Sequence, residues 1–228
     1  MDDALLTRLR AALQDAADPA KAPAMQAYLK SSMPYHGVPT PILRAVCKQV
    51  FADVDLPTAG AWQEQVLAIW RGAEYREERY AAINLSGHRR AEPFQTPDAL
   101  AMYEEMIVSG AWWDYVDVLA SHRVGGLLRR FPKQLTPIML TWSQSDDLWK
   151  RRTSIICQLR FKQETDLDLL YACIEPSLSS REFFLRKAIG WALRQYAWTD
   201  PAEVARFVAA HEEQLSPLSK REALKNVR

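Results

Sequence analysis

Glycine is scarce in this chain of 228 residues, which contains only 8. An average globular chain of this length would contain about 16. Because glycine inside a helix costs about 1 kcal/mol relative to alanine, this scarcity favours helices. The 13 prolines stand where helices would begin or end, as at Pro41, Pro97, Pro132, Pro201 and Pro217. The two observations together predict an all-α protein.

Cysteine is also rare, and the spacings typical of metal sites are missing. Cys47, Cys157 and Cys173 are odd in number, widely spaced and set among apolar neighbours. They are typical of reduced, packed thiols in a reducing compartment. Because the sequence has no CxxC pair and no His/Cys ligand spacing, we expect neither a metal nor another cofactor.

Long apolar runs are absent as well. No uncharged stretch approaches the ~18 apolar residues of a membrane span. The N-terminal segment MDDALLTRLR is acidic and amphipathic and lacks a signal-peptide core. We therefore expect a cytoplasmic protein that makes no use of a membrane.

The charges balance overall, with 29 Lys and Arg against 28 Asp and Glu, so net charge does not indicate a partner. Their distribution is uneven, because basic residues outnumber acids between Trp149 and Tyr196. These residues are Lys150, Arg151, Arg152, Arg160, Lys162, Arg181, Arg186, Lys187 and Arg194. A local basic face can bind a polyanion, since phosphate contacts are local. A solvated helix face is the alternative interpretation.

Apolar residues recur at helical spacing along almost the whole chain. The expected helices cover residues 3–16, 20–31, 40–53, 59–72, 75–90, 97–109, 111–131, 133–144, 146–162, 165–175, 180–197, 201–214 and 217–227. Connections are short, and no linker or low-complexity segment divides the sequence. We therefore expect a single domain over residues 1–228.

Four segments of the chain resemble one another. Each opens with aromatic or charged residues and continues into an apolar helix with a charged residue at one matching position. These positions are Arg79, Asp117, Arg152 and Lys187, separated by 38, 35 and 35 residues. This period fits one helix pair per repeat and predicts a HEAT-like helical repeat solenoid. Stacking would place the matching positions in a row, often on the concave side.

Two tryptophans accompany this charged row. Trp113 lies four residues before Asp117, hence on the same face of one helix, and Trp191 lies one turn after Lys187. Such tryptophans are more often part of a core. Asp and Arg are rarely buried without a partner, so an ion pair between Asp117 and Arg152 is the structural alternative to a functional site.

Several segments resemble the AlkD family of DNA alkylation repair enzymes. The most specific are WWDYVD at residues 112–117, RRTSI at residues 151–155 and RKAIGWALR at residues 186–194. GVPTP at residues 37–41 and LSKREALK at residues 218–225 are also similar to that family. The resemblance extends from about residue 25 to the end of the chain and keeps the order of the motifs.

The resemblance implies a HEAT-like solenoid whose concave face binds double-stranded DNA. It implies a monofunctional DNA glycosylase of base excision repair, which hydrolyses the N-glycosidic bond of N3- and N7-alkylated purines as a monomer. Trp113, Asp117 and Trp191 match the family's catalytic cleft, and Arg152 matches its phosphate-contacting arginine. Tyr28 matches a family tyrosine near the cleft and is expected to bind DNA.

Other residues are less closely tied to the family. His36 stands where the family has an apolar residue. Lys187, in the charged row, is expected either to contact a DNA phosphate or to be a solvated surface residue. Asp114 points about 100° away from Trp113 around the helix and is expected to support packing. Three histidines are expected to be structural: His88, His122 and His211.

The chemistry of these side chains agrees with the resemblance. Glycosidic cleavage passes through an oxocarbenium-like sugar, which the carboxylate of Asp117 can stabilise while it orients water. Ring faces of Trp113 and Trp191 can stabilise a cationic nucleotide. A non-catalytic DNA-structure-binding protein and a HEAT-type protein-interaction scaffold are the alternative functions, because one repeat fold hosts many functions.

Overall fold

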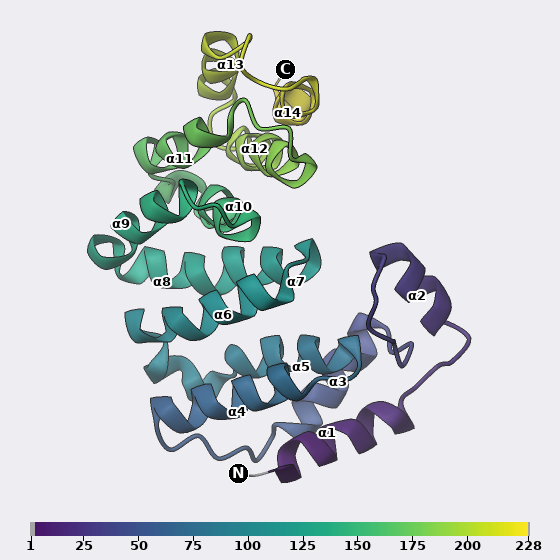
Figure 1. Ribbon diagram of the computed structural model, residues 1–228. Coiled ribbons are helices and arrows are strands. Elements are labelled where there is room, and N and C mark those ends of the chain that lie inside the picture. The colour runs from purple at the N-terminus through teal and green to yellow at the C-terminus, as the bar shows by residue number, and fades with distance from the viewer. Residues whose placement is uncertain (1–2, 228) are drawn as a thin grey trace. The chain divides into compact units, whose positions relative to one another are not determined.

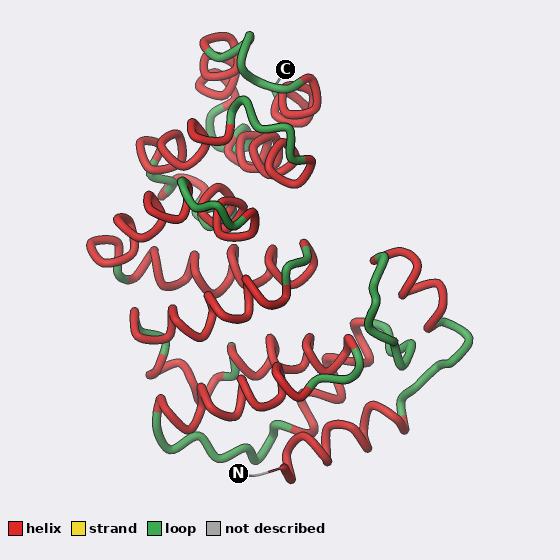
Figure 2. The backbone as a smooth tube through the Cα atoms, in the orientation of Figure 1, coloured by secondary structure: helices red, strands yellow, loops and turns green. Residues whose placement is uncertain are grey.

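The structure is a computed structural model and describes residues 3–227. Every regular element in this range is a helix, and Figure 2 shows no strand there. The predicted all-α class is therefore confirmed. The chain divides into two compact units, Met1–Gln95 and Thr96–Arg228. The single domain expected for residues 1–228 stays a prediction.

The first unit packs its helices around large buried side chains. Trp62, Trp70 and Leu9 are almost fully buried, and α5 contacts α1, α3 and α4. The helices are α1 (Asp3–Asp15), α2 (Ala22–Leu29), α3 (Thr40–Val50), α4 (Ala59–Gly72) and α5 (Arg76–Ser86), followed by a 3-10 turn at Arg89–Phe94.

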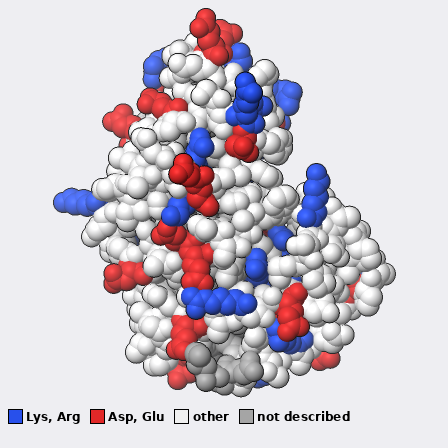
Figure 3. All heavy atoms as spheres, viewed as in Figure 1, with Lys and Arg blue, Asp and Glu red and all other residues white. Residues whose placement is uncertain are grey.

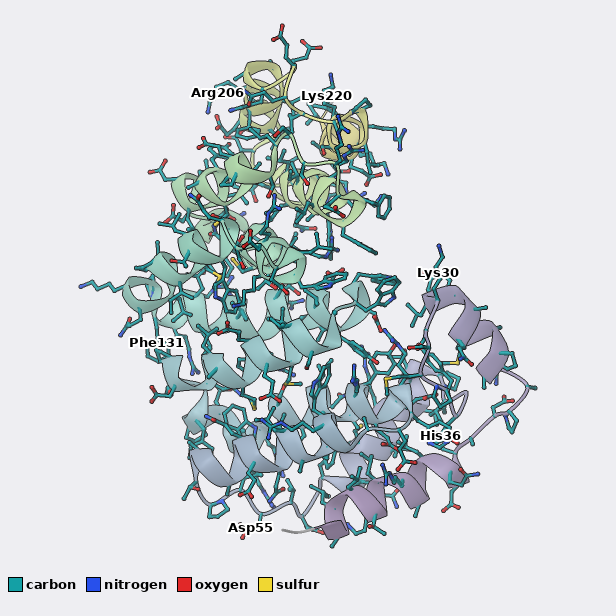
Figure 4. The ribbon with its side chains drawn as sticks, in the orientation of Figure 1. Lys30, His36, Asp55, Phe131, Arg206 and Lys220 are labelled. Carbon is teal, nitrogen blue, oxygen red and sulfur yellow. The ribbon has the colours of Figure 1, made fainter. Side chains whose placement is uncertain are left out.

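The loop between α2 and α3 is held by a buried carboxylate. Glu77 accepts hydrogen bonds from the backbone N–H groups of His36, Gly37 and Val38, at 3.1, 2.9 and 3.1 Å. Gly37 has a φ of 82°, and a Cβ there would lie 2.0 Å from a backbone oxygen, so only glycine fits. His36, labelled in Figure 4, is buried and stacks on Tyr75 at 3.7 Å. The imidazole of His36 is thus packed against an aromatic ring, while its Nε2 is buried without a hydrogen-bond partner among residues 3–227.

The second unit stacks helix pairs, as Figure 1 shows. Its helices are α6 (Leu100–Gly110), α7 (Trp113–Val118), α8 (Gly125–Arg130), α9 (Pro132–Ser143), α10 (Leu148–Ile156), α11 (Leu167–Ile174), α12 (Phe183–Tyr196), α13 (Pro201–Ala210) and α14 (Pro217–Ala223). In one row α7 contacts α10, α10 contacts α12 and α12 contacts α14, while α9 contacts both α10 and α11. Helix pairs stacked in this way agree with the expected repeat architecture.

Several helix boundaries differ from the sequence prediction, and three cases illustrate the differences. The helix expected at 111–131 contains a π-helical turn at Leu119–Val124, which separates α7 from α8. The helix expected at 146–162 ends at Ile156, and the chain then forms a loop in which the Gln158 side chain bonds the backbone of Asp166. The helix expected at 75–90 ends at Ser86, and His88 caps the following 3-10 turn. Periodicity alone does not show these side-chain-to-backbone bonds.

Glu222 on α14 forms ion pairs with three basic residues of the C-terminal helices. Its carboxylate is only 3% exposed and pairs with Lys187 at 3.0 Å, Arg194 at 2.7 Å and Lys225 at 2.6 Å. Gly190 makes this close packing possible, because a Cβ there would lie 2.5 Å from the Cβ of Glu222. Glu222 follows Lys187 by 35 residues, so the charged row continues one repeat further than the sequence analysis recognised.

We predict that Glu222→Gln destabilises the protein in a pH-dependent way. Hydrogen bonds from Lys225 and Lys187 outweigh burial and lower the pKa of Glu222 to about 2. A carboxylate with a lowered pKa stabilises the fold above its unfolded pKa of about 4.3, and this contribution disappears as pH falls towards the folded pKa. Because the cationic partners are partly exposed to water, the variant should lose on the order of 1–3 kcal/mol in free energy of unfolding at pH 7 and much less at pH 2 to 3.

Urea unfolding at several pH values measures this difference. Glu212→Gln, an exposed residue outside the cluster, is the control and should change stability little at any pH. A Glu222→Gln defect that is the same at pH 7 and pH 2.5 would contradict the role of the ion-pair cluster.

Candidate active site

The carboxylate of Asp117 is held by a bidentate ion pair. Arg152 Nε donates to Asp117 Oδ1 at 2.8 Å, and Arg152 Nη2 donates to Asp117 Oδ2 at 2.9 Å. Arg152 Nη1 donates to the backbone oxygen of Phe184 at 2.6 Å. The side chain of Arg152 is 4% exposed and that of Asp117 is 15% exposed. The ion pair that the sequence left open as an alternative therefore forms.

The environment of Asp117 changes its acidity. Burial raises the pKa of Asp117, and the nearby charge of Asp114 raises it further, while the hydrogen bonds and charge of Arg152 oppose both. The carboxylate is thus partly withdrawn from water but keeps a fixed cationic partner. Perturbed acidity of this kind, caused by burial and a specific charge, is a mark of functional sites.

An aromatic cluster lies beside the ion pair. Trp112 and Trp149 contact Phe184 with ring centroids 5.5 and 5.1 Å apart, and the guanidinium carbon of Arg152 lies 5.9 Å from the Phe184 ring centre. These three residues stand at or next to the first residues of α7, α10 and α12. The contact among these three rings was not predicted from the sequence, although the aromatic openings of the repeats were an available signal.

Asp117 and Trp191 line one hollow in the second unit, with a volume of about 430 Å³. Its lining residues are Asp117, Val118, Ser121, His122, Leu159, Arg160, Lys162, Trp191 and Gln195. Trp191 is half-buried and also packs against the apolar core of the C-terminal helices. A hollow of this size, with a few polar groups, is typical of ligand sites.

Trp113 is placed differently from the sequence expectation. It is the first residue of α7, one turn before Asp117, and it is half-buried. It is not among the residues that line the hollow. The structure therefore brings Asp117 and Trp191 together in the hollow and leaves Trp113 at the start of the helix that carries Asp117.

The expected DNA-binding residues have different surroundings. The side chain of Lys187 is 39% exposed and pairs with Glu222, whereas Arg152 is buried in its pair with Asp117. Tyr28 belongs to the first unit, on α2, and is 76% exposed. Their contacts with DNA stay predictions.

Two of the three histidines expected to be structural have surroundings that fit this expectation. His88 caps a 3-10 turn, and His211 stacks on Phe207 with ring centroids 4.2 Å apart. His122, in contrast, lines the hollow next to Asp117. Within residues 3–227, no three His, Cys, Asp or Glu side chains are grouped so that they could hold a metal ion. None of the helices described is long and apolar enough to cross a membrane.

Comparison with known proteins assigns the family. The sequence model of the family described as DNA alkylation repair enzyme matches residues 9–227. The chain belongs to the DNA alkylation repair enzyme family. The resemblance found in the sequence is thereby confirmed, and membership indicates DNA as the substrate.

A solved structure supports the assignment. This chain is similar to a predicted DNA alkylation repair enzyme from Enterococcus faecalis, with 29% sequence identity and a TM-score of 0.79. The match covers 92% of this chain and 95% of that one. No curated protein sequence matches this member of the family.

We predict strong coupling between Asp117 and Arg152 in the stability of this repair protein. Removing one member of a buried ion pair leaves an uncompensated charge, which costs about 3–5 kcal/mol. Arg152→Ala and Asp117→Asn should each lower the free energy of unfolding, and the double variant should lose clearly less than their sum. Chemical denaturation of the four proteins measures the coupling.

An exposed ion pair provides the control for this cycle. Arg129 and Glu164 pair at 2.9 Å, and their side chains are 45% and 67% exposed. Exposed pairs contribute about 0–1 kcal/mol, so Glu164→Gln should change stability little. Additive losses in the Asp117 and Arg152 variants would show that the two side chains do not depend on each other.

Proposed function

We propose that this DNA alkylation repair protein is a monofunctional DNA glycosylase that releases N3- and N7-alkylated purines from double-stranded DNA. The observation that carries the proposal is the carboxylate of Asp117, fixed by Arg152 and exposed to a hollow that also contains Trp191. The family assignment supports repair of alkylated DNA as the process. We propose further that the protein acts as a monomer in base excision repair in the cytoplasm. The three buried, unpaired cysteines support a reducing compartment.

The proposed reaction is hydrolysis at the anomeric carbon. Alkylation at N3 or N7 makes the purine cationic, so the bond from C1′ to the base breaks with the electron pair on a neutral base. The sugar passes through an oxocarbenium-like state, to which a fixed carboxylate gives electrostatic stabilisation. Asp117 orients a water molecule, whose oxygen bonds to C1′ and whose proton passes to the carboxylate or to solvent. The products are a free base and an abasic site.

The other candidate residues have supporting roles in this proposal. Trp191 presents its ring to the cationic nucleotide, an interaction of roughly 0.5–2 kcal/mol. Trp113 lies one turn before Asp117 and contributes a second ring face, while Lys187 and Tyr28 contact the DNA. Arg152 fixes Asp117 and is also proposed to contact a phosphate. Asp114 remains outside the hollow and influences Asp117 through its charge.

Release of the free base tests this function directly. Wild-type protein incubated with duplex DNA that contains N7-methylguanine should release the methylated base. Asp117→Asn should slow single-turnover release at least tenfold, about 1.4 kcal/mol in barrier, because the amide cannot stabilise a positive charge in the same way. Undamaged duplex should bind about equally well to both proteins.

Asp114→Asn is the matched control, since it removes the neighbouring carboxylate on the same helix. It should retain nearly full activity, and rates are compared per folded molecule because Asp117→Asn weakens the ion pair. Unchanged release by Asp117→Asn would remove its proposed role. Complete absence of release by wild type, with DNA binding retained, would favour a non-catalytic DNA-structure-binding protein.

We also predict a pH dependence set by the ion pair. The carboxylate of Asp117 must be ionised to act, so release should fall as pH drops through its pKa, which lies above the ordinary Asp value of about 3.9. Arg152 lowers this pKa, so Arg152→Gln should raise it and move the acid limb to higher pH. Single-turnover rates across pH, within the range where circular dichroism shows folded protein, measure the shift. If the acid side of the pH–rate profile of Arg152→Gln stays at the wild-type pH or moves to lower pH, the coupling is contradicted.

A further inference from the structure

The hollow beside Asp117 also contains a cationic group of side chains. His122 follows Asp117 by five residues, on the order of 7 Å along the helix, and Arg160 and Lys162 come from the loop after α10. Arg160 Nη1 lies 3.4 Å from His122 Nε2. We name these three residues the basic rim. A carboxylate with a tryptophan and a separate basic group therefore line the same hollow.

Most of the basic residues between Trp149 and Tyr196 are already bonded within the protein. Lys150 pairs with Glu104, Arg152 with Asp117, and both Lys187 and Arg194 with Glu222. Two more donate to neutral oxygens, Arg151 to the Ser177 hydroxyl and Arg186 to the Ser180 backbone. Each of these cations therefore already has a bond inside the protein, although Glu222 alone is shared by Lys187, Arg194 and Lys225 and leaves part of their charge uncompensated.

Arg160 and Lys162 differ from these residues. Both are exposed, and within residues 3–227 neither has a carboxylate within ion-pair distance. Arg181 is also exposed and has no such carboxylate in that range, but it does not line the hollow. Figure 3 shows basic and acidic side chains interspersed on one face of the molecule, so that face has no broad basic patch. Unpaired cations in a hollow are the groups that most readily bind a phosphate, because no internal bond must be broken first.

The loop that carries Arg160 and Lys162 is held in a defined conformation. Arg129 donates to the backbone oxygen of Arg160 at 2.8 Å, and its guanidinium carbon lies 4.5 Å from the ring centre of the buried Phe161. Gln158 bonds both the backbone N–H and the backbone oxygen of Asp166, at 2.8 and 2.9 Å. Lys162 has a φ of 54°, which is unfavourable for a residue with a Cβ and is retained by this framework.

His122 orients Arg160 in this arrangement. A guanidinium is always protonated, so Arg160 Nη1 is the donor and His122 Nε2 the acceptor. His122 is therefore neutral there, with its proton on Nδ1. Burial lowers the pKa of His122, and the charges of Arg160 and Arg123 lower it further, which agrees with the neutral form.

We propose that the basic rim is a phosphodiester-binding subsite for the DNA strand whose nucleotide occupies the hollow. Arg160 and Lys162 contact the phosphate, and His122 positions Arg160. The relation of this subsite to catalysis rests on the proposed glycosylase function, whereas phosphate binding by the rim does not. The subsite gives the substrate strand an exposed anchor next to Asp117, in addition to the buried guanidinium of Arg152.

Salt dependence of DNA affinity tests the subsite. Affinity for an undamaged fluorescent duplex is measured by anisotropy over a range of salt concentrations for wild type, Arg160→Gln, Lys162→Gln and the double variant. Each phosphate-contacting cation that is removed should lower the slope of log affinity against log salt by about one, and the double variant by about two. A double variant with the wild-type slope would overturn the proposal.

Two matched controls have the same change in charge outside the hollow. Arg206→Gln, on α13 and labelled in Figure 4, is the control for Arg160, and Lys133→Gln, an exposed residue on α9, is the control for Lys162. Both should keep the wild-type slope. A slope lowered as much by the controls as by the rim variants would show non-specific attraction and would also overturn the subsite.

The positioning role of His122 requires a separate measurement. His122→Phe should lower the slope when Arg160 is present and have no further effect in the Arg160→Gln background. His122→Gln keeps an acceptor for Arg160 and should restore the slope. An effect of His122→Phe that is equal in both backgrounds would show that His122 does not act through Arg160.

Base release measured on the same proteins separates this proposal from the proposed function. Normal release by wild type together with an unchanged slope in the double variant overturns the subsite and leaves the glycosylase function intact. A lowered slope in the double variant, together with no base release by wild type, supports the subsite and overturns the glycosylase function. A lowered slope with slower release in the double variant supports both.

Discussion

The buried ion pair between Asp117 and Arg152 is the constraint on which the arrangement of the second unit depends. Two charges removed from water tolerate burial only when each satisfies the other with good geometry. The bidentate contact supplies this geometry, and the third bond of Arg152 reaches the backbone of Phe184. One guanidinium therefore connects α7, α10 and the first turn of α12. The position of the Asp117 carboxylate is fixed by three successive helix pairs.

The same arrangement decides which charges are available to DNA. Charged residues recur every 35 residues as Asp117, Arg152, Lys187 and Glu222. The first two form one ion pair and the last two form another. Pairing stabilises the stack and engages most of the basic residues of this segment in bonds within the protein. A DNA phosphate is therefore contacted most readily by the few cations that remain unpaired. The loop that carries Arg160 and Lys162 is therefore proposed to contribute to DNA binding, which its sequence did not indicate.

Much of the fold followed from the sequence because its causes are local. Glycine scarcity, helical periodicity and proline at helix starts predicted the all-α class, and the matching charged positions predicted stacked helix pairs. Motifs such as WWDYVD and RKAIGWALR indicated the repair family, which the family match confirms. The placement of Trp191 in the same hollow as Asp117 also agrees with the repeat spacing. Helix ends were less well predicted, since side chains such as Gln158 and His88 bond the backbone there.

The sequence by itself determined the helices, because helix formation depends on neighbours within one or two turns, and the period of the repeats, because it is a spacing along the chain. Only the tertiary structure decided which charges became partners. The contact between Asp117 and Arg152 joins residues 35 apart, and the contact between His122 and Arg160 joins residues 38 apart. Side-chain direction and exposure to water depend on how helices pack, so spacing did not distinguish a buried guanidinium from an exposed one. Arg152 is buried and binds the carboxylate of Asp117, whereas Arg160 is exposed and lines the hollow.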